Sequence, residues 1–491
     1  MSIGLYIVLA PLYLKSVRKL QEKRFVFVKI LAIIIPENGA KVSKIKCFQF
    51  AQQTLTNGPV TKKMMLFSLP LIAGNLLQQT YNIADTVIVG RFLGADALAA
   101  VGSSYTLMTF LTSILLGLCM GSGALFSIRY GEKNEEKLKE NIGTSFLMIA
   151  AVAILLNVLV CRNTEWILEF LQVPQQVYDG MRTYLEVVFT GILATFLYNY
   201  FASLLRAAGE SLIPLIFLAA CAGLNIVLDL WFVIGLDAGI AGAAVATVIS
   251  QWISGIGIAV YTWGRCPQFR LRRRDFRITK ETFGEIFQFS FLTCVQQSVM
   301  NLGILMVQGL VNSFGPIVMA AFAAAVKIDS FAYMPVQDFG NAFSTFVAQN
   351  YGAGKQERIR EGARKSVLLV LGFCLVISAS VFVFAKQLLL IFVQPYETEI
   401  LAVGIQYLRI EGVFYFGIGF LFLFYGYYRA VRKPGMSVVL TVISLGTRVV
   451  LAYVLSAVPQ IGVSGIWSAV PIGWILADIA GWIYYKKLQQ R

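Results

Sequence analysis

Apolar runs of about 20 residues recur along almost the whole chain, with short polar gaps between them. A helix of that length spans the hydrocarbon core of a bilayer. Lipid offers the backbone no hydrogen-bond partners, so only helices or closed barrels can cross it, and these runs do not alternate as barrel strands do. The pattern predicts an all-α integral membrane fold with twelve transmembrane helices, near 64–90, 98–128, 141–161, 183–205, 211–234, 239–263, 284–312, 317–349, 364–385, 400–428, 435–457 and 462–485.

Composition agrees with this pattern. The chain is 57% hydrophobic and 14% charged, whereas a soluble domain is about 25% charged. A soluble protein could not cover so much apolar surface with polar groups. The chain has no histidine, and its seven cysteines show no paired or metal-type spacing. Any proton chemistry would therefore depend on carboxylates, and the cysteines are predicted to be reduced packing residues.

The net charge of +15 is distributed by topology. Lysines and arginines concentrate in alternate gaps between the apolar runs, and the intervening gaps carry few, namely Arg91, Arg162, Arg182 and Lys386. By the positive-inside rule this predicts a multi-pass plasma-membrane protein whose N- and C-termini are both cytoplasmic. The same placement argues against nucleic-acid binding.

The two halves of the chain resemble each other. At a nearly constant spacing, Tyr130-Gly131 returns as Tyr351-Gly352, Gly94 as Gly315, Arg206-Ala207 as Arg429-Ala430, and Gly239 as Gly462. Six helices return the chain to its starting side, so the copies should be related by a pseudo-two-fold axis along the membrane normal. The predicted organisation is an N-lobe at 61–264 with helices 1–6, a basic cytoplasmic linker at 265–282 and a C-lobe at 283–491 with helices 7–12.

Residues 1–60 lie outside the repeat and are rich in lysine and arginine. Their apolar start is short for a membrane span and lacks the basic beginning of a signal peptide. One interpretation is a basic interfacial segment. The interpretation that we favour is a translation artefact upstream of a functional start near Leu55.

Charged residues inside apolar helices are costly, so they are the first candidates for function. Asp85 lies in the first predicted helix, with Asn82 one turn earlier, and Asn225 and Asp229 are four apart in the fifth. Carboxylates with amide neighbours in a low dielectric can hold a proton or a small hard cation such as Na⁺. The alternative is that each aspartate only forms a hydrogen bond between helices.

The repeat favours the functional interpretation of this pair. The positions equivalent to Asp85 and Asp229 in the second half are Met306 and Ala452. A purely structural role would more naturally be shared by both halves. The pair therefore predicts a coupling-ion site in the N-lobe.

Other candidates are less specific. Lys327 and Asp329, in the eighth helix, could pair with each other or line a cavity, and Glu186 and Arg409 occupy equivalent positions that could pair between the halves. Pro70 removes a backbone hydrogen bond and would permit a bend in the first helix. Aromatic side chains suit lipophilic cations. The remaining cavity candidates are Tyr81, Asn82, Tyr333, Gln296 and Glu411.

Motifs of enzymes and ATP-driven pumps are missing from the sequence. No GxxxxGK[ST] loop, nucleophile elbow or HExxH occurs. The sequence therefore favours a carrier that is driven by an ion gradient and needs no cofactor other than H⁺ or Na⁺ as coupling ion.

At this point the chain resembles a known family, the multidrug and toxic compound extrusion (MATE) transporters. The resemblance covers about 56–487 and is carried by LPLIAGNLLQQTYNIADTVIVGRFLGADALAAVG at 69–102, NIVLDLWF at 225–232, GIAGAAVATVIS at 239–250 and AAVKIDSFAYMPVQDFGNAFSTFVAQNYGAGK at 324–355. It implies a V-shaped bundle with two six-helix lobes, and export of cationic drugs or metabolites in exchange for H⁺ or Na⁺.

The resemblance also implies roles for single residues. It adds Asn199, Tyr184 and Thr247 to the coupling-ion site of Asp85, Asn225 and Asp229, and it matches Pro70 to a proline at which the first helix bends in some members. Some members use acidic residues on helices 7 and 10 of the second lobe. Here those helices show Gln296 and Glu411 at that depth, so a second-lobe ion site is not expected.

Two alternatives to an antiporter remain. A flippase for lipid-linked saccharide precursors would share the two-lobe plan, but it should have several buried arginines. A non-transporting membrane scaffold or receptor should show no charge-sensitive ion response. The expected partners are a small, lipophilic cationic substrate and membrane lipids, with no nucleic acid and no obligate protein partner.

Overall fold

The computed structural model describes residues 54–171 and 173–490, and within these ranges the chain forms helices and turns but no strand. The predictions for residues 1–53 lie outside the described part. The first half contains α2 (Val60–Phe92), α3 (Ala95–Gly131), α4 (Glu135–Arg162), α5 (Thr164–Phe170), α6 (Gln175–Val188), α7 (Ile192–Ala207), α8 (Leu212–Asp229) and α9 (Gly239–Arg265). The second contains α10 (Lys280–Asn312), α11 (Pro316–Gly352), α12 (Gln356–Leu389), α13 (Thr398–Gly412), α14 (Tyr415–Ala430), α15 (Pro434–Ser456) and α16 (Val463–Gln489).

All twelve predicted helices have a counterpart, and the all-α membrane fold is confirmed. Two of them are broken, because the fourth consists of α6 and α7 joined by a 3-10 turn at Phe189–Gly191, and the tenth consists of α13 and α14, bent by 50°. Among the described residues, ten helices are long and apolar enough to cross a membrane, and the bent pair makes an eleventh. The remaining counterpart, α2, is diluted by polar residues such as Asn75, Gln79 and Asp85.

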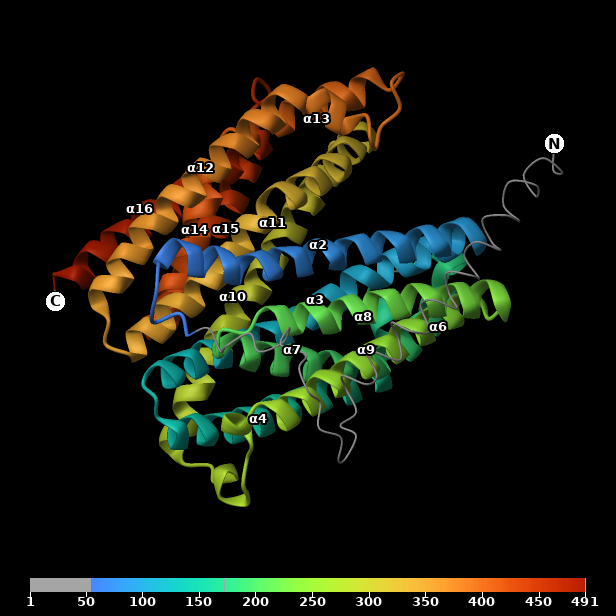
Figure 1. Cartoon of the computed structure of the whole chain (residues 1–491). Helices are drawn as coiled ribbons and strands as arrows, with labels where there is room; N and C mark the ends of the chain where they lie inside the picture. The colour runs from blue at the N-terminus through green and yellow to red at the C-terminus, as the bar shows by residue number, and fades with distance from the viewer. Residues whose placement is uncertain (1–53, 172, 491) are drawn as a thin grey trace, which may run out of the picture.

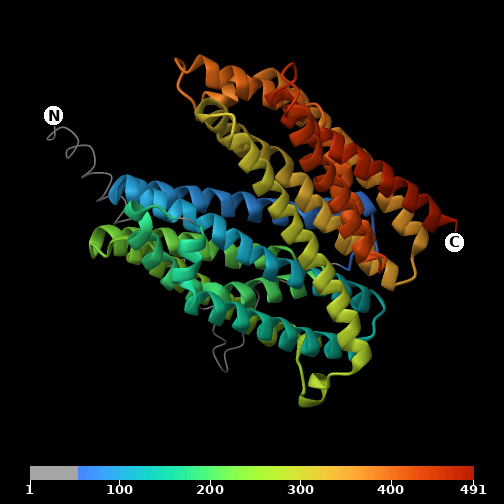
Figure 2. The same ribbon diagram turned by 180° about the vertical axis from the view of Figure 1, so that it is seen from behind.

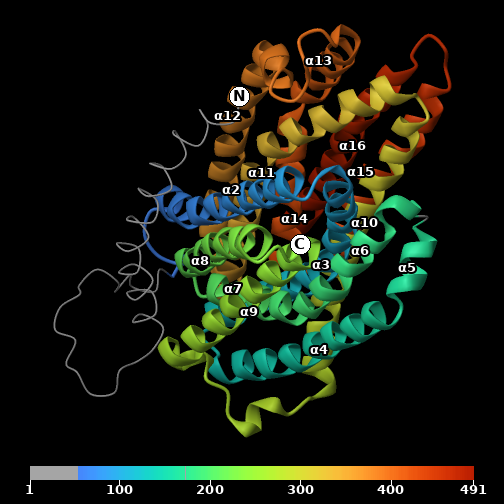
Figure 3. The same cartoon turned by 90° about the vertical axis from the view of Figure 1, so that its right-hand side faces the viewer.

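The helices form two bundles that together resemble a V (Figure 1). Helices α2–α9 make one bundle, in blue and green, and α10–α16 make the other, in yellow to red. The bundles meet at the left of Figure 1 and diverge to the right, and Figure 3 shows them from the diverging side. The end at which they meet carries Arg129, Arg265, Lys355 and Arg432, and is called the basic end below.

Two long helices, α10 and α2, connect the bundles, because each contacts a helix of the other bundle. The first half of α10 lies on α3, where Ser122 Oγ is 2.8 Å from Ser290 Oγ and a Cβ on Gly121 would lie 2.3 Å from the Phe289 carbonyl oxygen. Figure 2 shows α10 running from its own bundle to the other. Helix α2, of the first bundle, contacts the second bundle in turn: Asn75 of α2 donates to Asp338 Oδ1 of α11 at 2.5 Å. Contact between the bundles is thus concentrated in the halves of these helices toward the basic end.

The internal repeat is visible in the backbone. Gly94 and Gly315, which precede α3 and α11, have φ of 92° and 93°. Gly239 and Gly462, at the beginning of α9 and α16, have φ of 58° and 52°. L side chains rarely adopt these angles, so the same turn requires glycine in both halves. This is why glycines are among the clearest matches between the two halves of the sequence.

Candidate ion site

Asp85, Asn225 and Asp229 come together where α2 packs beside α8. Asp229 is the last residue of α8, and a π-helical turn, Leu230–Gly235, follows it directly. Turns of this kind often occur at functional sites. Asn225 lies one turn earlier on the same face, and both residues are buried, with exposed fractions of 2% and 0%. Asp85 is half-buried, in the half of α2 that lies away from the basic end.

The two aspartates interact directly with each other. The carboxyl groups of Asp85 and Asp229 are close enough to interact electrostatically. The buried phenol of Tyr184, on α6, is close enough to interact electrostatically with both. Two carboxylates in contact repel each other unless a proton or a cation lies between them.

The oxygens of this cluster lack donors. Asn225 Nδ2 donates to Thr247 Oγ1 at 3.2 Å, and the Thr247 hydroxyl donates to the Ala243 carbonyl at 3.1 Å. Asp85 Oδ1, Asn225 Oδ1 and both carboxylate oxygens of Asp229 are buried without a hydrogen-bond partner among the described residues. Buried polar atoms are nearly always satisfied. These four unsatisfied oxygens, three of which belong to carboxyl groups, are suited to bind a proton or a small hard cation.

The other N-lobe candidates are placed as follows. Asn199 donates to the Thr195 carbonyl of its own helix at 2.9 Å. Asn82 Nδ2 lies 3.3 Å from Gln79 Oε1 and 3.5 Å from the Tyr105 hydroxyl, and Tyr81 lies close to Asp85. Helix α2 continues through Pro70 without a break. The structure therefore brings Tyr184 to the aspartates and Thr247 to Asn225, whereas Asn199 forms a hydrogen bond within its own helix.

A second buried acidic cluster lies in the other bundle, and sequence reasoning missed it. Asp329 of α11 accepts hydrogen bonds from the hydroxyls of Tyr407, at 2.7 Å, and of Tyr415. Glu411 of α13 lies within hydrogen-bond reach of Asp329, and the guanidinium of Arg448 lies nearby. Both acids are buried, with exposed fractions of 4% and 2%. Helical spacing relates residues on one helix only, so it could not join these acids, although each stood out as a charge in an apolar helix.

Two ion pairs that the sequence allowed are not formed. Lys327 and Asp329 do not pair, because the Lys327 ammonium lies over the Phe392 ring, 5.8 Å from its centroid. Glu186 and Arg409 do not pair between the halves either. Glu186 accepts from Arg182 at 2.9 Å, and the Arg409 guanidinium lies 5.2 Å from the centroid of the Phe382 ring. Each of these charged side chains other than Asp329 thus contacts an aromatic ring or a residue of its own helix in place of the other member of the pair.

The remaining C-lobe candidates are Gln296 and Tyr333, and Tyr333 lies close to the Asp329–Glu411 cluster. Gln296 of α10 is buried with an exposed fraction of 3%. The ring of Tyr333 packs against that of Phe422, with 6.3 Å between centroids. Neither contacts Asp85 or Asp229 in any described interaction.

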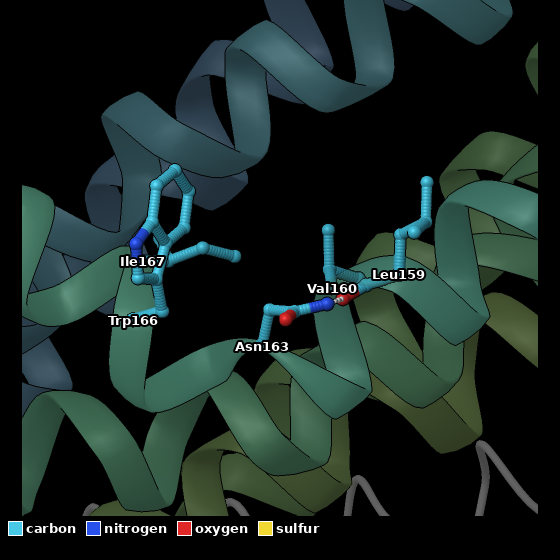
Figure 4. A pocket seen from close by; sticks show the side chains of 5 residues that line it. All are labelled: Leu159, Val160, Asn163, Trp166 and Ile167. Carbon is cyan, nitrogen blue, oxygen red and sulfur yellow. Dashed lines mark hydrogen bonds between the residues drawn. The ribbon is translucent and has the colours of Figure 1, made fainter.

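A surface pocket of about 440 Å³ lies at the corner between α4 and α5 (Figure 4), lined by Leu159, Val160, Asn163, Trp166 and Ile167. Asn163 Nδ2 donates to the Leu159 carbonyl at 2.7 Å. Trp166 stacks on Phe170, and its side chain is 62% exposed. Exposed tryptophans at helix ends are typical of the membrane–water interface. The pocket contains none of the candidate ion-site residues.

Comparison with known proteins agrees with this architecture. The family model MatE matches residues 70–231 and 291–454, one segment in each half. The probable multidrug resistance protein YpnP of Bacillus subtilis is 31% identical over 437 residues, covering 88% of this chain and 96% of that protein. The probable multidrug resistance protein NorM of Thermotoga maritima is 25% identical, covering 86% and 90%.

A solved structure has the same fold. It is described as the outward-facing conformation of a multidrug resistance MATE family transporter of the MOP superfamily, and it aligns with a TM-score of 0.83 at 22% identity, covering 89% of this chain and 97% of that one. The family model covers more than half of the sequence in two matched segments. The chain therefore belongs to the MatE family, whose members are membrane transporters and not enzymes.

Proposed function

We propose that this protein is a secondary antiporter that exports small, lipophilic cations from the cytoplasm in exchange for H⁺ or Na⁺. The two relatives described above are named probable multidrug resistance proteins, which supports drugs as the transported molecules. The observation that carries the coupling mechanism is the set of four buried oxygens of Asp85, Asn225 and Asp229 that lack a hydrogen-bond donor.

The proposed site takes one ion at a time. A proton or Na⁺ between Asp85 and Asp229 relieves the repulsion of the two carboxylates, and the amide oxygen of Asn225 completes the oxygen donors. Thr247 orients the Asn225 amide by accepting from its nitrogen, and Tyr184 closes the site from the α6 side. Ion binding thus stabilises one arrangement of α2 against α8.

The proposed direction of transport is outward, and the shape of the molecule is compatible with it. Positive-inside placement assigns the basic end, where the bundles meet, to the cytoplasm. The V then opens outward. In this scheme an ion that enters from outside neutralises the aspartates and α2 bends at Pro70, so that substrate is released outward. Ion and substrate need no common site, because each only has to stabilise the state that the other disfavours.

The test is ethidium efflux from proteoliposomes under an imposed H⁺ or Na⁺ gradient. We expect one gradient to drive efflux in the wild type and Asp85→Asn to abolish it. The substitution keeps the side-chain shape and removes the charge. Asp237→Asn is the matched control, because Asp237 is exposed and has a φ of 52°, an angle that asparagine adopts easily.

Each outcome separates the hypotheses. Efflux that follows one gradient and fails only in Asp85→Asn identifies the ion and supports the site. Equal efflux in Asp85→Asn and the wild type would refute the site and leave a transporter. No efflux with either gradient would refute export of this class of cation.

A further inference from the structure

Four charged side chains form a closed ring at the basic end. Arg129 Nη1 lies 2.8 Å from Glu132 Oε2, and Arg129 Nη2 lies 2.5 Å from Glu285 Oε2. Arg432 Nη2 lies 3.2 Å from Glu132 Oε1, and Arg432 Nη1 lies 3.0 Å from Glu285 Oε1. Each carboxylate therefore gives one oxygen to each arginine, and the charges alternate around the ring.

The ring joins the two halves of the chain. Arg129 and Glu132 lie at the end of α3, Glu285 lies in the first turns of α10, and Arg432 lies in the turn between α14 and α15. The side chains have exposed fractions of 9%, 27%, 19% and 34% respectively. Isolated surface ion pairs contribute little, whereas a partly buried network with shared partners is a more effective contact.

The backbone at Arg432 shows that this side chain is held there against a conformational cost. Arg432 has a φ of 60°, in the left-handed region that favours glycine. The equivalent residue of the first half is Gly209, with a φ of 90°. The second half therefore keeps an arginine at a turn position where the first half has the residue with no steric penalty. The two ion pairs that Arg432 forms in the ring offset this conformational cost.

The repeated Tyr-Gly motif lies beside the ring. A Cβ on Gly131 would lie 2.0 Å from the carbonyl oxygen of Gln349, and a Cβ on Gly352 would lie 2.0 Å from the carbonyl oxygen of Ile128. The ends of α3 and α11 thus cross in backbone contact, and each half contributes one glycine to the same contact. The side chain of Gln349 also donates to the Ala207 carbonyl at 2.7 Å, from one bundle to the other.

We propose that the Arg129–Glu132–Arg432–Glu285 ring and the Gly131–Gly352 crossing are the latch of a cytoplasmic gate. The latch holds the lobes together at the basic end, and it must open before a substrate can enter from the cytoplasm. The proposal rests on the proposed function for its assignment of this end to the cytoplasm. The equilibrium between open and closed lobes can nevertheless be measured without substrate and without an ion gradient.

The experiment measures that equilibrium by double electron–electron resonance (DEER) spectroscopy on the spin-labelled full chain in nanodiscs. Spin labels are attached at Lys137→Cys on α4 and Arg364→Cys on α12, two exposed positions at the basic ends of the two lobes, after the seven native cysteines have been replaced. The wild-type ring should give mainly the short, closed distance. Arg432→Glu removes two ion pairs and adds repulsion from two carboxylates, so the open population should rise roughly tenfold or more.

Restoration separates pairing from packing. In the quadruple variant Arg129→Glu, Glu132→Arg, Glu285→Arg and Arg432→Glu every pair is re-formed with inverted sign, and the closed distance should return. The matched control is Arg182→Glu, which breaks two exposed pairs, to Glu165 and Glu186, within one lobe. It should leave the distance distribution unchanged.

The outcomes decide the proposal. An unchanged distribution in Arg432→Glu overturns the latch, and so does opening that persists in the quadruple variant. If Arg432→Glu does not yield folded protein, Arg432→Gln removes the pairs without adding repulsion and should open the gate to a smaller extent. Because no ion gradient or dye is used, a failure of the antiport assay does not change the interpretation of this result.

Discussion

The donor-free oxygens around Asp85 and Asp229 lead to a quantitative prediction about stability. A cation that binds only the folded protein stabilises it by RT ln(1 + [L]/Kd), about 2.7 kcal/mol at a hundred times Kd. For a chain of this size, that corresponds to a rise in Tm of about 3 °C. If Na⁺ is the coupling ion, we expect Na⁺ to raise the Tm of the wild type by this amount against an equal concentration of choline.

The same site predicts the effect of a substitution. Asp85→Asn removes one of the two charges that attract the cation, so the Na⁺-dependent rise in Tm should disappear. In the absence of Na⁺ the variant should be at least as stable as the wild type, since it no longer contains two carboxylates in contact. Protons compete for the same oxygens, so the rise in the wild type should be smaller at low pH.

The chain contains a suitable reporter of unfolding. Cys119 and Cys374 are buried, with exposed fractions of 0% and 1%, so a thiol-reactive fluorophore labels them as the helices separate. Cys161 is exposed and gives a constant baseline. The control is Asp237→Asn, whose Na⁺ response should equal that of the wild type. A Na⁺-dependent rise of the same size in Asp85→Asn would refute the assignment of these oxygens as the cation site.

Three further predictions use the same assays. Leu55→Ala should lower stability by about 2–4 kcal/mol, because Leu55 is buried with an exposed fraction of 1%; the thermal assay shows this as a fall in Tm. Tyr200→Phe should cost about 1 kcal/mol, because the Tyr200 hydroxyl lies 2.7 Å from the carbonyl of Ile142, and a Tm equal to that of the wild type would contradict it. Glu411→Gln should retain gradient-driven ethidium efflux, and its loss in proteoliposomes would place the coupling ion in the second lobe.

The helices of the fold could be predicted from the sequence because only a few backbone conformations can cross a lipid bilayer. Every apolar run of the right length became a helix, and the broken fourth and tenth helices were still found as single elements. The break at Phe189–Gly191 and the 50° bend between α13 and α14 were not predicted. The apolar residues in both places are compatible with a straight helix, so packing against neighbours must determine the 3-10 turn in the fourth helix and the bend in the tenth.

The candidate site was predictable in part. Asn225 and Asp229 could be placed on one helix face from their spacing of four residues. Asp85 stood out because a charged residue in an apolar helix is energetically costly. The structure brings the three residues together. The cluster of Asp329 with Glu411 could not be found in this way, because its members lie on different helices. Nor did any pattern predict Arg432 as a partner of Glu132, since that contact depends on how the two halves cross.

Buried acids occur in both lobes, and the balance of charge is the reason why we place the proposed ion site in the first lobe. Asp329 already accepts from two tyrosine hydroxyls, and the charge of Arg448 offsets one of the two acids. Asp85 and Asp229 have no arginine or lysine that is described as an electrostatic partner, and three of their oxygens have no donor. A buried charge needs a counter-charge, and where the protein does not supply one, a bound ion can. The first-lobe cluster therefore has both the larger unbalanced charge and the free oxygens, which is the combination that the proposed coupling-ion site requires.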